Sequence, residues 1–180
     1  MKIIILGAGA VGRTLASLLS EEHDLVVVDQ DTAQLHRLEE ESDIQTLTGG
    51  ASYPNILVNA GIMDADMVVA VTDSDETNIV SCMISKVLNK SVQTVARVRE
   101  ISYLKGKTKE AMDSGEIPVD IHISPEQLIT EHIQGLIEIP GSLQVMEFGE
   151  GQLNLVAVRA VEGGPMIGHE IGDLKKHMPR

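Results

Sequence analysis

Short apolar runs rich in β-branched residues alternate along this chain with segments of helical periodicity, and this alternation restricts the possible folds most strongly. Valine and isoleucine together number 36 of the 180 residues, and such residues suit strands that are buried on both faces. Repeated strand–helix alternation implies right-handed crossovers and a parallel sheet. The predicted strands are Lys2–Leu6, Leu25–Asp29, Ile44–Thr48, Met67–Thr72, Val92–Val98 and Ile117–Ile123. The sequence therefore predicts an α/β fold, a doubly wound parallel six-stranded Rossmann sheet over residues 1–123.

Local signals place the helices between these strands. Asp31 with Gln34 three residues later is typical of a helix start. Pro54 is expected to open a third helix and Gly61 to end it. The fifth helix is predicted to span about Ser102–Ser114. Apolar stripes facing the core are predicted for the first helix at Val11, Leu15, Leu18 and Leu19, and for the fourth at Ile79, Val80, Met83, Ile84 and Val87.

From residue 124 the pattern changes. Ser124-Pro125-Glu126-Gln127 is a strong helix start, and residues 124–140 are predicted to form one helix that ends at Pro140-Gly141. Residues 141–180 are predicted to contain a hairpin, with strands Leu143–Phe148 and Leu153–Val161. Because so short a segment does not close a core alone, we expect it to pack on a partner subunit or to begin a β-rich lobe that the chain truncates. The apolar stripe of the helix consists of Ile129, Ile133, Leu136 and Ile137.

The charge of the chain excludes one class of partner. Its net charge is −13, so it lacks the basic footprint that nucleic-acid binding requires. Its single cysteine, Cys82, excludes an internal disulfide and leaves a zinc site without its usual thiolates. The apolar start of the chain is too short for a signal peptide, and no apolar run approaches the ~18 residues of a membrane span. We therefore expect a cytoplasmic protein.

A glycine motif, G-A-G-A-V-G, follows the first predicted strand directly and opens the first predicted helix. In this setting the first glycine allows a tight turn, the second lets backbone approach a pyrophosphate, and the third lets the helix pack on the strand. The helix N-terminus presents free N–H groups and positive potential to phosphate oxygens. The context favours a nucleotide site over a plain glycine turn. The candidate residues are Gly7, Ala8, Gly9, Ala10, Val11 and Gly12.

Asp29 ends the second predicted strand, where a carboxylate can accept hydrogen bonds from both ribose hydroxyls. A 2′-phosphate at this place would meet Asp29 and Asp31 with no arginine beside them, since residue 30 is Gln. NADP is therefore disfavoured. NAD, NADH, ATP and ADP all remain compatible, because the glycine loop contacts phosphates and Asp29 contacts ribose.

Two further strand ends are expected to border the same crevice, because ligands of such sheets lie at the carboxyl ends of the strands. Thr72 and Asp73 are candidate ligand contacts, although capping of the next helix by Asp73 with Glu76 explains them equally well. A divalent metal held by these acids is less favoured. Of the two arginines that follow, Arg97 is a candidate phosphate clamp, and a surface ion pair is the alternative for either Arg97 or Arg99.

The sequence predicts neither a catalytic residue nor a metal site. The six histidines are scattered, and Cys82 is interpreted as a small core residue. Tyr103 and Lys107 have the spacing of short-chain dehydrogenases, but Gly106 weakens the helix between them and no serine is suitably placed. Only about 60 residues follow the sixth strand. The chain is therefore predicted to sense a nucleotide rather than to act as an enzyme; a fragment of an NAD-dependent oxidoreductase is the alternative.

The chain resembles the family of domains that regulate potassium conductance (RCK, also called KTN), and within it the regulatory subunits of Trk-type potassium uptake systems. The resemblance covers nearly the whole chain. It implies nucleotide contacts at the glycine loop, Asp29, the Gly50-Ala51 turn, Thr72-Asp73 and Arg97. Ala51 departs from the acidic or polar residue that many relatives have. The resemblance rests on residues 1–12, Asp29, Thr72–Asn78, Ala96-Arg97-Val98-Arg99, and the segments 123–128, 139–145 and 163–168.

The same resemblance implies how the chain is organised and what it contacts. Residues 124–140 would be a crossover helix that swaps against a neighbour, and residues 141–180 the first part of a small C-terminal lobe. The implied assembly is a homodimer or higher oligomer, with the stripe of Ile129, Ile133 and Ile137 as the interface. Bound NAD(H) or ATP/ADP would shift populations and so gate a potassium-translocating membrane subunit from its cytoplasmic face. A regulator of potassium efflux is a further alternative.

Overall fold

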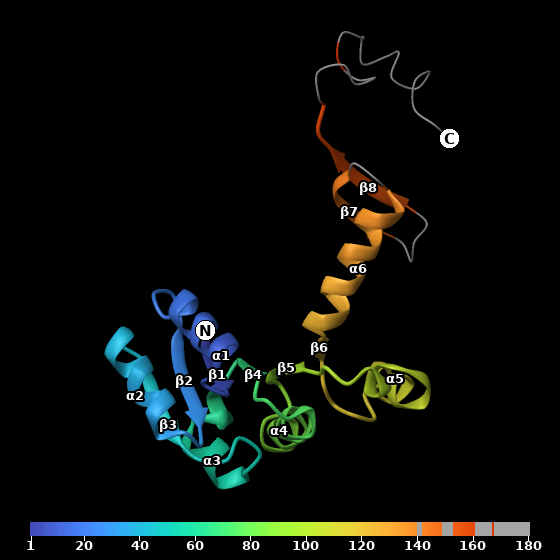
Figure 1. Ribbon diagram of the computed structural model, residues 1–180. Coiled ribbons are helices and arrows are strands. Elements are labelled where there is room, and N and C mark those ends of the chain that lie inside the picture. Colours follow the sequence, from blue (N-terminus) through green and yellow to red (C-terminus); the bar gives the residue numbers. More distant parts are fainter. Residues whose placement is uncertain (140–141, 149–152, 161–166, 168–180) are drawn as a thin grey trace. The chain divides into compact units, whose positions relative to one another are not determined.

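The structure is a computed structural model, and it describes residues 1–139, 142–148, 153–160 and 167 (Figure 1). The chain divides into two compact units, Met1–Pro125 and Glu126–Arg180. The first unit contains the parallel sheet and the second a helix with a two-stranded sheet. None of the described helices is long and apolar enough to cross a membrane.

The first unit is built on a six-stranded parallel sheet, which confirms the predicted fold class. The strands lie in the order β3-β2-β1-β4-β5-β6, so the strand order reverses between β1 and β4. Four of the five residues of β1 are buried, as expected for a strand between two helical layers. The strands are β1 Lys2–Leu6, β2 Asp24–Asp29, β3 Gln45–Thr48, β4 Met67–Ala70, β5 Gln93–Arg97 and β6 Ile121–Ile123.

Helices cover both faces of this sheet and bury two separate apolar clusters. One cluster joins α1 and α2 to Ile3, Ile5 and Val27. The other joins α3, α4 and α5 to the opposite face, around Ile4 and Val68. The helices are α1 Ala10–Leu19, α2 Thr32–Glu41, α3 Pro54–Asn59, α4 Asp75–Leu88 and α5 Gly106–Asp113, with short 3₁₀ turns η1 Ile62–Asp64 and η2 Ile101–Leu104.

Most predicted strands differ from the observed ones by one to three residues at an end, and two predicted elements differ more. The sixth strand begins at Ile121 rather than Ile117, because the N–H of Thr94 on β5 donates to the Asp120 side chain, Oδ2, at 2.7 Å. The Asp120 side chain thus takes the place of a backbone carbonyl of β6 as the acceptor for this N–H. The predicted fifth helix is broken between η2 and α5, since Lys105 has an extended backbone with φ −132° and ψ 156°.

The predicted apolar stripes of α1 and α4 were partly wrong. Val11 and Leu18 on α1 are exposed, and so are Val80, Met83 and Val87 on α4. Ile79 is buried as predicted, but the rest of the buried face of α4 is formed by small and polar side chains. These let the helix approach β5 closely, and the Cys82 thiol lies 3.7 Å from the Val95 carbonyl oxygen. The buried side chains on this face are Asp75, Asn78, Ile79, Ser81, Cys82 and Ser85.

The second unit contains the predicted helix and hairpin. The helix α6 spans Pro125–Glu138, and the antiparallel strands are β7 Ser142–Phe148 and β8 Leu153–Val158. Gly135 allows α6 to lie against β7, because a Cβ there would be 3.1 Å from the Cβ of Val145. The predicted helix end at Pro140-Gly141, the hairpin turn 149–151 and residue Val161 lie outside the described residues.

Candidate nucleotide-binding site

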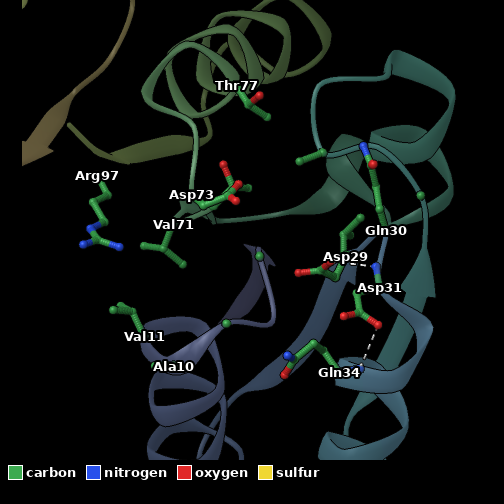
Figure 2. A pocket seen from close by; sticks show the side chains of 16 residues that line it. Ala10, Val11, Asp29, Gln30, Asp31, Gln34, Val71, Asp73, Thr77 and Arg97 are labelled. Atoms are coloured by element: carbon green, nitrogen blue, oxygen red, sulfur yellow. Dashed lines mark hydrogen bonds between the residues drawn. The ribbon is translucent and has the colours of Figure 1, made fainter. Parts of the chain in front are cut away.

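A cavity of about 530 Å³ lies where the strands of the parallel sheet end, and its size is within the range of small-molecule sites. Its walls come from the ends of β1, β2, β4 and β5 and from the first turns of α1, α2 and α4 (Figure 2). This is the place where the strand order reverses, as expected for a ligand site in such a sheet. The lining residues are Gly7, Gly9, Ala10, Val11, Val28, Asp29, Gln30, Asp31, Gln34, Gly49, Ala51, Val71, Thr72, Asp73, Thr77 and Arg97.

The three glycines of the motif, two in the loop between β1 and α1 and one in the first turn of α1, serve three different steric needs. Gly7 has a φ of 109°, and a Cβ there would lie 3.0 Å from the backbone nitrogen of Thr72. A Cβ on Gly12 would overlap the carbonyl oxygen of Gly7. A Cβ on Gly9 would have no heavy atom within 4 Å, so this residue alone leaves open space beside the cavity. The loop thus keeps a vacant approach at Gly9 while Gly7 and Gly12 pack against backbone.

The N-terminus of α1 faces this open space. Gly9 is its N-cap residue and offers no side-chain cap, while Ala10 and Val11 of the first turn line the cavity. The first N–H groups of a helix have no partner within it and carry a partial positive charge. A phosphate group fits this arrangement, because its oxygens supply the missing acceptors.

Asp29 lies at the end of β2 and links the glycine loop to the next turn. Its Oδ2 accepts from the Ala8 N–H at 2.6 Å, and its Oδ1 accepts from the Asp31 N–H at 2.8 Å. Each oxygen retains a further lone pair for a ligand hydroxyl. Asp31 caps α2 as predicted, with Oδ1 2.9 Å from the Ala33 nitrogen and 3.4 Å from the Gln34 nitrogen.

The opposite wall is formed by Thr72, Asp73 and Arg97, which follow or end β4 and β5 (Figure 2). The alternative interpretation of Asp73 as the cap of α4 was wrong, because Ser74 is the N-cap residue and its hydroxyl oxygen accepts from the Thr77 N–H at 3.0 Å. Arg97 lines the cavity, whereas Arg99 forms an ion pair with Asp75, with Nε 3.3 Å from Oδ1. Only the first of the two arginines is therefore placed to meet a ligand.

Asp75 is a buried carboxylate that the sequence did not single out. Its Oδ2 accepts from the backbone N–H groups of Arg99 at 2.8 Å and Glu100 at 2.7 Å, so it holds the segment after β5 against α4. Burial raises the pKa of Asp75, but these backbone hydrogen bonds and the Arg99 guanidinium lower it by more, so the pKa lies below its ordinary value. Asp120 is similar: burial raises its pKa, and Lys86 and Thr94 lower it by more.

The lowered pKa values of Asp75 and Asp120 predict that the folded chain loses stability in acid. Their pKa values in the folded chain lie below the unfolded value of 3.8. Their stabilising contribution is therefore complete above about pH 5 and is lost as the pH falls through the lower, folded pKa values. Urea unfolding between pH 6 and pH 2 should show this decline, and Asp75→Asn should flatten it. Asp113→Asn, at an exposed carboxylate paired with Lys109, is the matched control and should leave the pH profile unchanged.

Nine of the twelve predicted site residues line the cavity, and three do not. Ala8 and Gly12 lie behind the loop: Ala8 is fully buried and contributes its N–H to Asp29, and Gly12 packs on Gly7. Gly50 lies against the Tyr53 ring, with a Cβ position 3.0 Å from it, and Gly49 lines the cavity in its place. The lining residues outside these twelve are Val28, Gln30, Asp31, Gln34, Gly49, Val71 and Thr77. Helical spacing from the Asp31 cap is the signal that would have indicated Gln34.

The described cavity walls contain no histidine, cysteine or serine. Tyr103 and Lys107 do not line the cavity, and they lie on different elements, η2 and α5. Cys82 is buried as predicted, and burial raises the pKa of its thiol to about 12. Among the residues that the structure describes, no group of three or more His, Cys, Asp or Glu could hold a metal ion.

Solved structures share this fold. The TrkA-N domain of the inner membrane protein ybaL from Escherichia coli has a TM-score of 0.64 at 18% identity, over 76% of this chain and 96% of that one. The RCK domain of GsuK has a TM-score of 0.61 at 22% identity, over 76% of this chain and 28% of that one. At these identities the likeness is one of fold.

Sequence comparison goes further. The Trk system potassium uptake protein TrkA of Halomonas elongata is 50% identical over 180 residues, which are 99% of this chain and 39% of that protein. The TrkA protein of Vibrio alginolyticus is 48% identical over 181 residues, with the same shares covered. This chain thus spans about two fifths of the length of these curated relatives. The family model described as the TrkA-N domain matches residues 3–124. The chain therefore belongs to the TrkA-N domain family.

Proposed function

We propose that this chain is the nucleotide-binding part of a regulatory subunit that controls a Trk-type potassium uptake system. The observation that carries the proposal is the cavity itself: phosphate can be matched to Gly9 and the start of α1, and ribose to Asp29. The names of the relatives support a role in potassium uptake. Regulation rather than catalysis is the role we infer, and the family to which the chain belongs supports it.

The ligand we propose is NAD(H), ADP or ATP. Phosphate would lie at Gly9 and the start of α1, and ribose at Asp29. Asp29 and Asp31 would repel a 2′-phosphate, which disfavours NADP(H). Related folds support these nucleotides, since structures exist of GsuK bound to NAD and GsuK bound to ADP, and of the Shewanella denitrificans Kef C-terminal domain in an AMP-bound form.

The regulated partner would be a potassium-translocating membrane subunit, met at its cytoplasmic face, so we propose a cytoplasmic protein that associates peripherally with the membrane. Nucleotides that prefer one arrangement of paired copies would shift the population toward it. The exposed Ile129, Ile133 and Ile137 on α6 support a homo-oligomer, with residues 124–140 as its crossover helix. Residues 141–180 would then belong to a C-terminal lobe.

Fluorescence titration with NADH tests this proposal. The chain has no tryptophan, so the emission of the ligand is free of overlap. We expect saturable NADH binding that ADP and ATP displace from one shared site, with weaker binding of NADPH. The same samples should sediment as a dimer or larger species. Preference for NADPH would contradict the role of Asp29, and failure of ADP and ATP to compete would favour the oxidoreductase interpretation.

A further inference from the structure

A buried amide joins the two strand ends that form one wall of the cavity. Asn78 lies on α4, and its side chain is fully buried. Its Oδ1 accepts from the Thr72 N–H at 2.9 Å and from the Thr72 hydroxyl at 2.7 Å. Its Nδ2 donates to the carbonyl oxygens of Thr72 at 3.3 Å and Arg97 at 2.9 Å. Both donors and both acceptor sites of the amide are therefore used.

This bonding pattern depends on a primary amide. An ionised carboxylate in the same place would turn an acceptor oxygen toward the carbonyl oxygens of Thr72 and Arg97. A serine or threonine side chain offers a single hydroxyl donor and is too short to bridge the ends of β4 and β5. Because Thr72 and Arg97 line the cavity and Asn78 does not, any effect of Asn78 on a ligand must pass through those two residues.

We propose that Asn78 is a positioning residue for the nucleotide, which sets the places of Thr72 and Arg97 on the β4–β5 wall. This inference rests on the proposed function. The opposite wall has its own hydrogen bonds, between Asp29 and the N–H groups of Ala8 and Asp31, and these do not involve Asn78. A dinucleotide that spans both walls therefore depends on Asn78, whereas a mononucleotide seated at Asp29 and the glycine loop depends on it less.

Asn78→Asp tests the proposal because it exchanges one donor group for an acceptor at constant size. We expect the affinity for NADH to fall about tenfold, which is the loss of about one hydrogen bond to the ligand, and the affinity for AMP to fall less than twofold. Ser85→Ala is the matched control. Ser85 is also fully buried on α4, and its hydroxyl donates to the Ser81 carbonyl within the helix at 2.7 Å, so both affinities should be unchanged.

A second readout requires no ligand. The Thr72 N–H donates to Asn78 Oδ1, an acceptor that Asn78→Asp keeps and Asn78→Ser removes, so its hydrogen exchange should be faster in Asn78→Ser and unchanged in Ser85→Ala. Unchanged NADH affinity in a folded Asn78→Asp chain, or equal weakening of NADH and AMP, would overturn the proposal. If that variant does not fold by circular dichroism, Asn78→Ser carries the same expectations.

The two proposals fail in different ways. A wild-type chain that binds neither NADH nor AMP contradicts the proposed function. The exchange rate at Thr72 tests the structural premise separately, because a rate that is the same in wild type and Asn78→Ser shows that Asn78 does not hold this strand end and overturns the positioning role even where NADH binds.

Discussion

Replacing Gly12 by alanine is expected to lower the free energy of unfolding by about 3 kcal/mol or more, measured by urea unfolding. A Cβ at this position would overlap the carbonyl oxygen of Gly7 and lie 2.9 Å from the carbonyl carbon. Both are backbone atoms, so neither can turn aside as a flexible side chain would. Gly7 itself has little room to move away, because a Cβ placed on it would lie only 3.0 Å from the Thr72 nitrogen.

Gly9→Ala is the matched control in the same loop. Its added methyl group would have no heavy atom within 4 Å, and its φ of −66° suits alanine, so stability should stay within about 0.5 kcal/mol of wild type. The methyl group would occupy the space proposed for phosphate, and NADH affinity should therefore fall about tenfold or more. Equal losses of stability in the two variants would refute the steric explanation. Normal NADH binding by Gly9→Ala would refute the proposed place of the phosphate.

Asp29→Ala is expected to reduce the affinity for NADH about 100-fold. In the proposed complex the carboxylate accepts from two ribose hydroxyls, and hydrogen bonds to a charged acceptor contribute roughly 1.5–3 kcal/mol each. At the lower limit the two bonds contribute about 3 kcal/mol, which corresponds to slightly more than 100-fold in the dissociation constant. The substitution also removes the acceptor of the buried Ala8 N–H, so stability should fall by about 1–3 kcal/mol. Titration of folded protein, checked by circular dichroism, separates the two effects.

Asp31→Ser is the comparison for that experiment. A serine hydroxyl can replace the carboxylate as the cap of α2, so the fold should be retained. NADH affinity should change less than threefold, because ribose recognition is assigned to Asp29. NADPH should bind better relative to NADH, since its 2′-phosphate meets one carboxylate fewer. Equal losses of NADH affinity in the Asp29 and Asp31 variants would contradict the assignment of ribose to Asp29.

The β1–α1–β2 part of the site could be predicted from sequence because its signals are local. A glycine pattern between a buried strand and an amphipathic helix specifies the turn, and the next strand end brings Asp29 beside it. The Asp31 cap and the start of α6 are local in the same sense. Ala51 was predicted through resemblance alone and lines the cavity, whereas Gly50 was displaced by its neighbour Gly49.

The predictions failed where a side chain found its partner far away in the sequence. The periodicity of α4 suggested that Val80, Met83 and Val87 face the core, but the helix buries Asn78, Ser81, Cys82 and Ser85 against the sheet. Polar residues are tolerated there because each finds a hydrogen bond, as Asn78 does with Thr72 and Arg97. Hydrophobic periodicity carries no information on such bonds.

The sequence by itself determined the alternation of strands and helices and the pairing of the glycine motif with Asp29, because these features depend on residues close together in the chain. It also determined the family, because the family follows from direct comparison of sequences. Tertiary structure alone decided which strand ends meet. It separated Arg97, in the cavity wall, from Arg99, paired with Asp75, although the two arginines are two residues apart. The physical reason is that a carboxylate or amide is satisfied by whichever hydrogen-bond partner the packed sheet brings within about 3 Å, and that partner lies 19 residues away for Asn78 and 24 residues away for Asp75.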